Sequence, residues 1–207
     1  MPDYQFETAI LNGAPGWVAG CDEAGRGPLA GPVVAAAVIL PPGLSVPGLD
    51  DSKALSEKKR DSLFDILHRE AHAVSVAAVS AQTIDRINIR QASLLAMRLA
   101  LTRLAVAPQA ALFDGRDVPD HLPAQLMTQA VIGGDAKCMS IAAASIIAKV
   151  TRDRMLQQLD GVHPQYGFAS HKGYGSARVH QEAIAAHGGA TRVHRMSFAP
   201  FRQGSLF

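Results

Sequence analysis

Short apolar runs bounded by glycine and proline alternate along this chain with longer stretches that are apolar on one side only. Four to eight consecutive apolar residues between turn residues are typical of buried strands. Five such runs predict strands at residues 17–21, 33–40, 73–79, 110–113 and 129–132. A short turn joins the first two runs, which favours an antiparallel pair and therefore a mixed sheet.

The one-sided stretches predict four helices, which cover residues 57–71, 89–106, 141–159 and 176–187. Ser56 is a suitable N-cap for the first of them, because its hydroxyl can accept a hydrogen bond from a free backbone N–H group. The segment HPQYGFASHKGYG is interpreted as an ordered loop. Strands interleaved with helices indicate an α/β fold.

Length and composition indicate how many domains the chain forms and in which compartment it works. A chain of 207 residues that is 48% hydrophobic and 18% charged can form one packed domain. The net charge of +2 is compatible with a nucleic-acid partner but too small to indicate one. Neither a membrane-spanning run nor a signal peptide is evident, and Cys21 and Cys138 have no metal-like spacing. We therefore expect free thiols and a cytoplasmic enzyme or binding protein.

Acidic residues follow three of the predicted strands, namely Asp22 with Glu23, Asp114 in LFDG, and Asp135 in GGDAK. Strand ends at one edge of an α/β sheet can converge, and four converging carboxylates repel one another unless cations neutralise them. Oxygen ligands favour Mg²⁺ or Mn²⁺ over zinc. Each acid also has a simpler interpretation, as part of a turn or of a solvated loop end. Adjacent strand residues point to opposite faces, so a shared site requires the strand to bend or end near Glu23.

The glycine-rich stretch GRGPLAG does not fit a dinucleotide-binding loop. Its spacing is one residue too long, Pro28 and Pro32 interrupt the expected helix, and the adjacent acids would repel a pyrophosphate. The stretch can be a backbone that another chain approaches closely, with Arg26 as a donor, or a plain tight turn.

Two further loops carry candidate binding residues. In DDSKALSEKKR, Lys53 and its basic neighbours could hold a phosphate at a helix start, although a solvated helix face is the commoner cause of such a run. In ASHKGYG, Tyr174 with His171 and Lys172 could stack on a sugar or base and pair with a phosphate.

In combination, these stretches closely resemble ribonuclease HII, the bacterial type 2 ribonuclease H. The matching pieces occur in family order and are GCDEAGRGPLAGPVVAAAVIL, DDSKALSEKKR, LFDG, GGDAKCMSIAAASIIAKVTRD, HPQYGFASHKGY and HRMSF. The resemblance implies a ribonuclease H-like core over residues 1–160, with a mixed sheet flanked by helices. It also implies a helical C-terminal extension over residues 161–207 that packs on the core and ends in a flexible tail.

The resemblance also implies an activity. The family cuts the RNA strand of RNA–DNA hybrids and nicks duplex DNA on the 5′ side of embedded ribonucleotides, leaving 5′-phosphate and 3′-hydroxyl ends. By motif, the catalytic, metal-binding acids are Asp22, Glu23, Asp114 and Asp135, and two Mg²⁺ or Mn²⁺ ions act between them. The implied substrate-binding residues are Gly25, Arg26, Gly27, Ser52, Lys53, His171, Lys172 and Tyr174.

Two positions near the fourth acid depart from or compete with this pattern. Family members usually have serine after the fourth acid, where this chain has Ala136, so a supporting hydroxyl is in doubt. Asp153 is an alternative fourth acid, but its helical context favours a structural ion pair with Arg152 or Arg154.

The tail RQGSLF suggests a partner. Gln203, Leu206 and Phe207 resemble the short peptide by which bacterial DNA-associated proteins dock on the replication sliding clamp, although a frayed terminus explains them equally well. The family setting implies roles in DNA replication and ribonucleotide excision repair, and we expect a monomer with no membrane partner.

Three other functions compete with this interpretation. A ribonuclease H-like nuclease that acts on DNA junctions would share the acids but has no need of Gly-Arg-Gly. A non-catalytic hybrid-binding protein would not need acids at every position. Ribonuclease HIII carries an additional N-terminal domain, for which we expect no room before Trp17.

Overall fold

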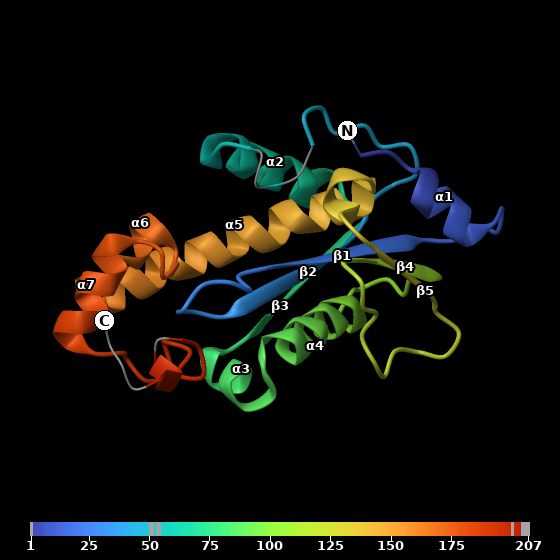
Figure 1. Cartoon of the computed structure of the whole chain (residues 1–207). Coiled ribbons are helices and arrows are strands. Elements are labelled where there is room, and N and C mark those ends of the chain that lie inside the picture. The colour runs from blue at the N-terminus through green and yellow to red at the C-terminus, as the bar shows by residue number, and fades with distance from the viewer. Residues whose placement is uncertain (1, 50–51, 53–54, 200, 204–207) are drawn as a thin grey trace.

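The five predicted strands form one mixed sheet in the order β3-β2-β1-β4-β5 (Figure 1). The computed structural model describes residues 2–49, 52, 55–199 and 201–203. The strands are β1 (Val18–Ala24), β2 (Val33–Ile39), β3 (Ala73–Val79), β4 (Ala110–Asp114) and β5 (Met127–Val131). Pairing is antiparallel between β1, β2 and β3 and parallel between β1, β4 and β5, which confirms the mixed sheet.

Helices cover both faces of the sheet. One face packs against α5 (Met139–Val162), which is itself covered by α2 (Glu57–Glu70), and the other packs against α4 (Ile89–Thr102). Figure 1 shows α5 and α4 on opposite sides of the strands. All seven residues of β2 are buried, and they alternate between the two cores. This burial on both faces explains the continuous apolar sequence of the strand.

A glycine in β1 lets α5 lie unusually close to the sheet. Gly20 faces the first turn of α5, where a Cβ atom would lie 2.5 Å from the backbone oxygen of Ser140 and closer still to two other backbone atoms. The alanine-rich first half of α5 is buried along this contact. Small side chains on both elements therefore bring the two backbones together.

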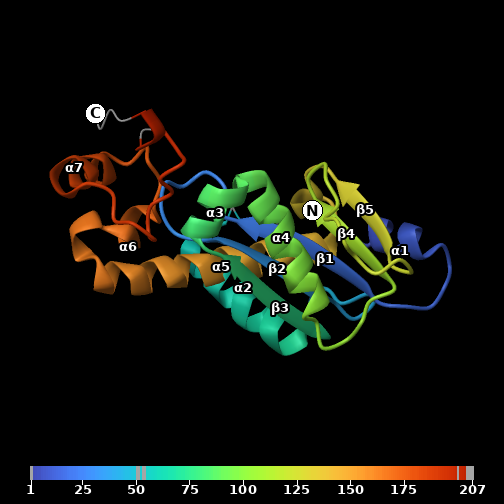
Figure 2. The ribbon, with the colours of Figure 1, turned by 90° about the horizontal axis from the view of Figure 1, so that it is seen from below.

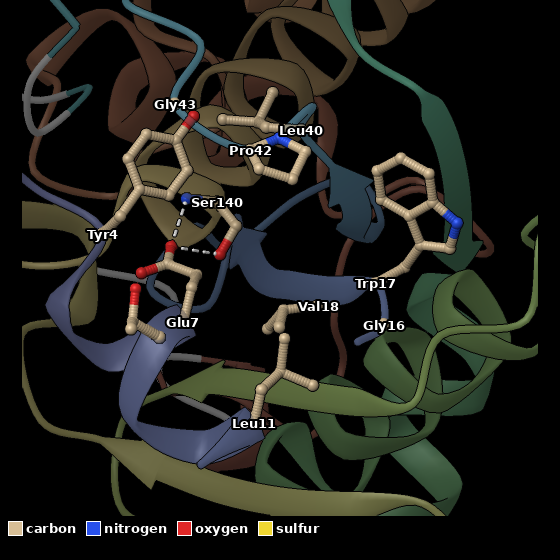
Figure 3. Close-up of a pocket in the computed structure, with 11 residues that line it drawn as sticks. Tyr4, Glu7, Leu11, Gly16, Trp17, Val18, Leu40, Pro42, Gly43 and Ser140 are labelled. Atoms are coloured by element: carbon tan, nitrogen blue, oxygen red, sulfur yellow. Dashed lines mark hydrogen bonds between the residues drawn. The ribbon is translucent and has the colours of Figure 1, made fainter. Parts of the chain in front are cut away.

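A short N-terminal helix that the sequence did not predict, α1 (Gln5–Leu11), supports the start of α5. Glu7 Oε1 accepts hydrogen bonds from the backbone nitrogen of Ser140 at 2.9 Å and from its hydroxyl at 2.7 Å (Figure 3). Burial raises the pKa of the Glu7 carboxyl. The side chains of Tyr4, Trp17 and Leu40 border a cavity of about 120 Å³ here, at the opposite end of β1 from the acids.

The chain ends in a separate group of short helices at one end of the sheet (Figure 2). These are η2 (Pro164–Tyr166), α6 (Phe168–His171), α7 (Arg178–His187) and η3 (Phe201–Gln203). Tyr166 and Phe168 are buried in a cluster with Ala30 of the β1–β2 loop and Leu156 of α5. This cluster attaches the C-terminal helices to the loop that follows the first acids.

The predicted elements differ from the observed ones mainly at their ends. The prediction that residues 163–175 form a loop without helices was wrong, since the segment contains η2 and α6. The helix α3 (Ala81–Ile87) was missed because its seven residues are too few to show a clear apolar repeat. Ser56 caps α2 as expected, with its hydroxyl 3.3 Å from the backbone nitrogen of Lys59. No helix among the described residues is long and apolar enough to span a membrane.

Candidate active site

The first two acids lie within β1 rather than beyond its end. Asp22 and Glu23 pair with Ala36 and Ala35 of β2, and the strand continues to Ala24. The strand ends one residue beyond Glu23, as a shared site was expected to require, but the regular pairing at both acids directs their side chains to opposite faces of the sheet. Asp22 is on the side of α5, whereas Glu23 also borders a hollow beside α4.

The other two acids follow the neighbouring parallel strands. Asp114 is the last residue of β4, which pairs directly with β1, and Asp135 lies in the 3₁₀ turn η1 (Gly134–Ala136) after β5. The backbone N–H of Gly134 donates to Asp114 Oδ1 at 2.7 Å, which ties the two segments together. The topology thus places all four acids at one edge of the sheet.

Electrostatics show that these carboxylates interact. Burial raises the pKa of Asp22 well above its usual value, and the charges of Glu23, Asp114 and Asp135 raise it further. Burial also raises the pKa of Glu23, against the opposing effect of the Arg26 guanidinium at 3.2 Å. Ionising these acids together is costly without additional positive charge, so the cluster has the electrostatic character of a cation site.

The fit of a divalent cation is visible in one further detail. Glu23 Oε2 is buried and has no hydrogen-bond partner in the described part of the chain, although its other oxygen meets Arg26. A hard cation would satisfy such an oxygen. As the side chains stand, however, no three His, Cys, Asp or Glu residues among those described form a complete metal-binding group.

Three of the four acids border a cleft of about 280 Å³ that also contains most of the expected substrate contacts, whereas Asp135 is not among its lining residues. The described lining residues are Asp22, Glu23, Ala24, Gly25, Arg26, Gly27, Ser52, Asp114, Ser145, Lys149, Arg152 and Tyr174. Sequence reasoning missed Ser145, Lys149 and Arg152, which come from the buried face of α5. The apolar repeat of α5 gave no reason to expect polar residues facing the cleft. The spacing of three residues between Lys149 and Arg152 in KVTRD, which places both on one side of a helix, was a possible signal.

The Gly-Arg-Gly loop and Tyr174 lie next to each other in the lining of this cleft. Gly25 has a φ of +95°, which favours glycine, and it lies flat against the Arg152 side chain, where a Cβ atom would collide. A Cβ atom on Gly27 would lie 3.8 Å from the Tyr174 ring. Tyr174 itself is 45% exposed, which leaves its ring available to a ligand.

The remaining predicted contacts have mixed positions. Ser52 is buried beside the cleft and its hydroxyl lies 2.7 Å from that of Ser145, whereas Lys53 lies outside the described residues. His171 uses both ring nitrogens internally, at 2.7 Å from the Tyr166 oxygen and 3.1 Å from the Gly173 nitrogen. Its imidazole is therefore committed to holding the loop.

Neither Lys172 nor the described part of the tail lines the cleft. The Lys172 ammonium donates to the carbonyl of Ala169 and lies 3.9 Å from Glu57. Gln203 ends η3, and Leu206 and Phe207 lie outside the described residues. Direct substrate contact by Lys172 and partner contact by the tail stay predictions.

The expected partner of Asp153 was wrong. Its carboxylate pairs with Lys149 at 2.7 Å, one helical turn earlier, rather than with either neighbouring arginine. Spacing of four residues places side chains on the same face of a helix, whereas adjacent residues diverge. Ala136 is exposed, so its methyl group fills no interior position near the fourth acid.

Comparisons with known proteins agree with this arrangement. Ribonuclease HII from Mesorhizobium japonicum is 55% identical over 203 residues, which cover 98% of this chain and 87% of that protein. The structure of ribonuclease H2 from Pyrococcus horikoshii matches with a TM-score of 0.77 and 29% identity, covering 90% of this chain and 96% of that one.

A second solved structure, the complex of PCNA with ribonuclease HII from Archaeoglobus fulgidus, matches with a TM-score of 0.69 and 28% identity over 86% of this chain and 93% of that one. These matches confirm the ribonuclease H-like fold. The sequence model for ribonuclease HII matches residues 19–201. The chain therefore belongs to the ribonuclease HII family.

Proposed function

We propose that this chain is an endoribonuclease that hydrolyses the RNA strand of RNA–DNA hybrids and nicks duplex DNA on the 5′ side of embedded ribonucleotides. The observation that carries the proposal is the convergence of Asp22, Glu23 and Asp114 on the cleft that also holds the Gly-Arg-Gly loop and Tyr174. The acids alone would suit many nucleases, whereas the loop and the aromatic ring beside them suit a sugar-selective one.

The chain's own residues prepare the reaction. Asp22, Glu23, Asp114 and Asp135 would hold Mg²⁺ or Mn²⁺, which when bound supply an activated water and stabilise the leaving 3′ oxygen. Backbone N–H groups fix one oxygen of Asp22 at 2.6 Å and one of Asp114 at 2.7 Å, and so limit the rotation of both carboxylates. Lys149 also lies on the cleft wall, where its ammonium is paired with Asp153 at 2.7 Å.

Sugar selection would come from the loop and the ring together. The glycines on either side of Arg26 allow the backbone to approach the minor groove, where a 2′-hydroxyl distinguishes RNA from DNA. The exposed ring of Tyr174 would pack against the adjacent deoxyribose. Cleavage on this geometry leaves a 5′-phosphate and a 3′-hydroxyl.

A substrate panel tests the proposal. Wild-type protein is incubated with an all-DNA duplex, the same duplex with one ribonucleotide, and an RNA–DNA hybrid, each in Mg²⁺, Mn²⁺ or EDTA. We expect cleavage of the two ribose-containing duplexes, in the presence of either ion and not in EDTA. Cleavage of the all-DNA duplex would contradict the proposal, and preference for a branched DNA added to the panel would instead indicate a junction nuclease.

The C-terminal tail and one solved relative suggest a partner for this activity. The similar Archaeoglobus protein was solved with PCNA, a sliding clamp, and the tail residues Gln203, Leu206 and Phe207 could serve a similar contact. Deleting the last five residues should weaken clamp pull-down without changing nicking. We further propose a cytoplasmic monomer that acts in replication and ribonucleotide excision repair, with a catalytic core ending near residue 160 and a C-terminal extension beyond it.

A further inference from the structure

Two arginine side chains are buried beside the candidate active site with no acidic partner. Arg152 of α5 is 1% exposed and Arg195, in the segment before η3, is 0% exposed. Neither forms an ion pair with a carboxylate of the described residues. They belong to the pieces KVTRD and HRMSF, to which the proposed function assigns no role. The charges of Asp85 and Asp153 act on Arg195 and Arg152 only from beyond ion-pair distance, so the burial of these two cations requires another explanation.

Both guanidinium groups are satisfied by backbone carbonyls. Arg195 donates to Gly25 O at 2.6 Å, to Arg26 O at 2.9 Å and to Gly31 O at 3.1 Å. Arg152 donates at 3.1 Å to Ala30 O, to Pro32 O and to Lys172 O. Five of these six acceptors lie between residues 25 and 32, so the two arginines hold the whole loop between β1 and β2.

The contacts of Arg195 also determine where two amide groups point. The peptide unit is planar and trans, so the N–H of one residue points away from the C=O of the residue before it. Fixing Gly25 O toward Arg195 directs the N–H of Arg26 away from it, and fixing Arg26 O does the same for the N–H of Gly27. In the described part of the chain neither N–H donates a hydrogen bond. Both residues line the cleft.

Arg195 is itself held rigidly. Its backbone nitrogen donates to Leu29 O at 2.8 Å, and the nitrogens of Met196 and Ser197 donate to the Asp85 carboxylate at 3.0 and 2.9 Å. The guanidinium lies 5.2 Å from the centre of the Phe198 ring. The side chain thus reaches the loop from a fixed base on the C-terminal segment.

We infer that Arg195 is a positioning residue for sugar recognition, which presets the Arg26 and Gly27 amides as donors to a ribose oxygen in the cleft. The inference rests on the proposed function and names the part of the chain that gives the loop its selectivity. Arg152 complements it by joining the same loop, through Lys172 O, to the segment that carries Tyr174. The planar fork of arginine is required, because a lysine ammonium cannot reach three carbonyls in this arrangement.

The test compares Arg195→Lys with wild type and with Arg154→Lys, a surface change on α5 whose guanidinium pairs with the exposed Asp61 and lies 4.3 Å from the centre of the Phe64 ring, away from the cleft lining. Two quantities are measured well below the unfolding temperature. They are kcat/KM for nicking a duplex with one ribonucleotide, and the inhibition constant of the all-DNA duplex of the same sequence. Arg195→Lys should lower kcat/KM for nicking by about tenfold or more, a loss of about 1.4 kcal/mol. It should change the inhibition constant of the all-DNA duplex by less than about twofold. Arg154→Lys should change neither.

The wild-type and variant rates separate the failure of the proposed function from the failure of the inference about Arg195. If wild type does not nick the ribonucleotide duplex, the proposed function fails. If wild type nicks and Arg195→Lys has unchanged kcat/KM, the inference fails alone. A parallel loss in kcat/KM and in all-DNA binding would show general loosening of the cleft and would also overturn it.

A second measurement covers the case in which Arg195→Lys does not fold. Protein labelled with ¹⁵N, and carrying Asp114→Asn so that the duplex stays intact, is titrated with each duplex. The amide signals of Arg26 and Gly27 should shift with the ribonucleotide duplex and much less with the all-DNA duplex. Equal responses to both duplexes would overturn the inference.

Discussion

The close approach of β1 and α5 predicts a large effect from a very small substitution. In Gly20→Ala, the added methyl would lie 2.5 Å from the Ser140 oxygen and closer to two other backbone atoms, whereas ordinary contact begins near 3.4 Å. Backbone on both sides cannot rotate away, so the helix must move from the sheet by about 1 Å or more. Such a gap forfeits a quarter to a half of each dispersion contact along the interface.

The expected cost follows from this displacement. Overpacking in a well-filled core usually costs about 1–3 kcal/mol, and here the clash involves two rigid backbones rather than a side chain. We expect Gly20→Ala to lower the free energy of unfolding by about 3–5 kcal/mol, which is a large part of a typical stability of about 5–15 kcal/mol. With a urea m-value of about 2–3 kcal/mol/M, the unfolding midpoint should fall by about 1.5 M.

A second glycine on the same helix supplies the control. Gly161 is in the last turn of α5, and a Cβ atom there would meet nothing within 4 Å. Gly161→Ala should therefore stabilise the protein by up to about 1 kcal/mol through helix propensity. Urea unfolding followed by circular dichroism measures both variants. An unfolding midpoint for Gly20→Ala equal to that of wild type would refute the close approach.

Three smaller predictions concern groups outside the cleft. Burial lowers the pKa values of His180 and His194 to about 4, so the unfolded chain binds protons that the folded one does not as pH falls from about 6.5 to 4. The free energy of unfolding should therefore decrease as pH falls over that range, and it should decrease less steeply in His180→Gln. Urea unfolding at a series of pH values measures both slopes, and equal slopes for the variant and wild type would count against this. Burial raises the pKa of Cys138 to about 12 and also raises that of Cys21. Both thiols should therefore react with a disulfide reagent at least about a hundredfold more slowly in native protein than in urea-unfolded protein. Ser56→Ala should lower the free energy of unfolding by about 1 kcal/mol through loss of the α2 cap, as measured by urea unfolding, whereas an unchanged value would mean that water replaces the cap.

The strands of the sheet could be predicted from the sequence because the apolar runs and turn residues that mark them are local. β2 is a continuous apolar run and β3 is interrupted only by Ser75, and the observed strands match the predicted ones within two residues except at the end of β1, which extends three residues further, to Ala24. The helices α2 and α4 show clear one-sided repeats. By contrast, α1 and α3 are each seven residues long, and what stabilises them is tertiary contact, such as that between Glu7 and Ser140, which no local pattern reveals.

The candidate site was predictable in its residues but not in its geometry. The acids at successive strand ends, together with the family motifs, identified which side chains to examine. That Asp22 and Glu23 lie inside β1 and leave opposite faces depends on how far β2 pairs with the strand. The contacts of Arg195 span up to 170 positions in sequence, so only the folded chain shows that it holds the Gly-Arg-Gly loop.

The most direct test of the candidate site is the Mg²⁺-dependent nicking rate of Asp114→Asn on a duplex with one ribonucleotide, measured in a single turnover. Asp61→Asn, which removes an exposed carboxylate paired with Arg154, is the matched control. We expect Asp114→Asn to nick at least about a thousandfold more slowly than wild type while its urea midpoint is unchanged or higher, and Asp61→Asn to nick normally. Nicking by a folded Asp114→Asn protein at a rate close to that of wild type would contradict the assignment of the acids as the catalytic centre.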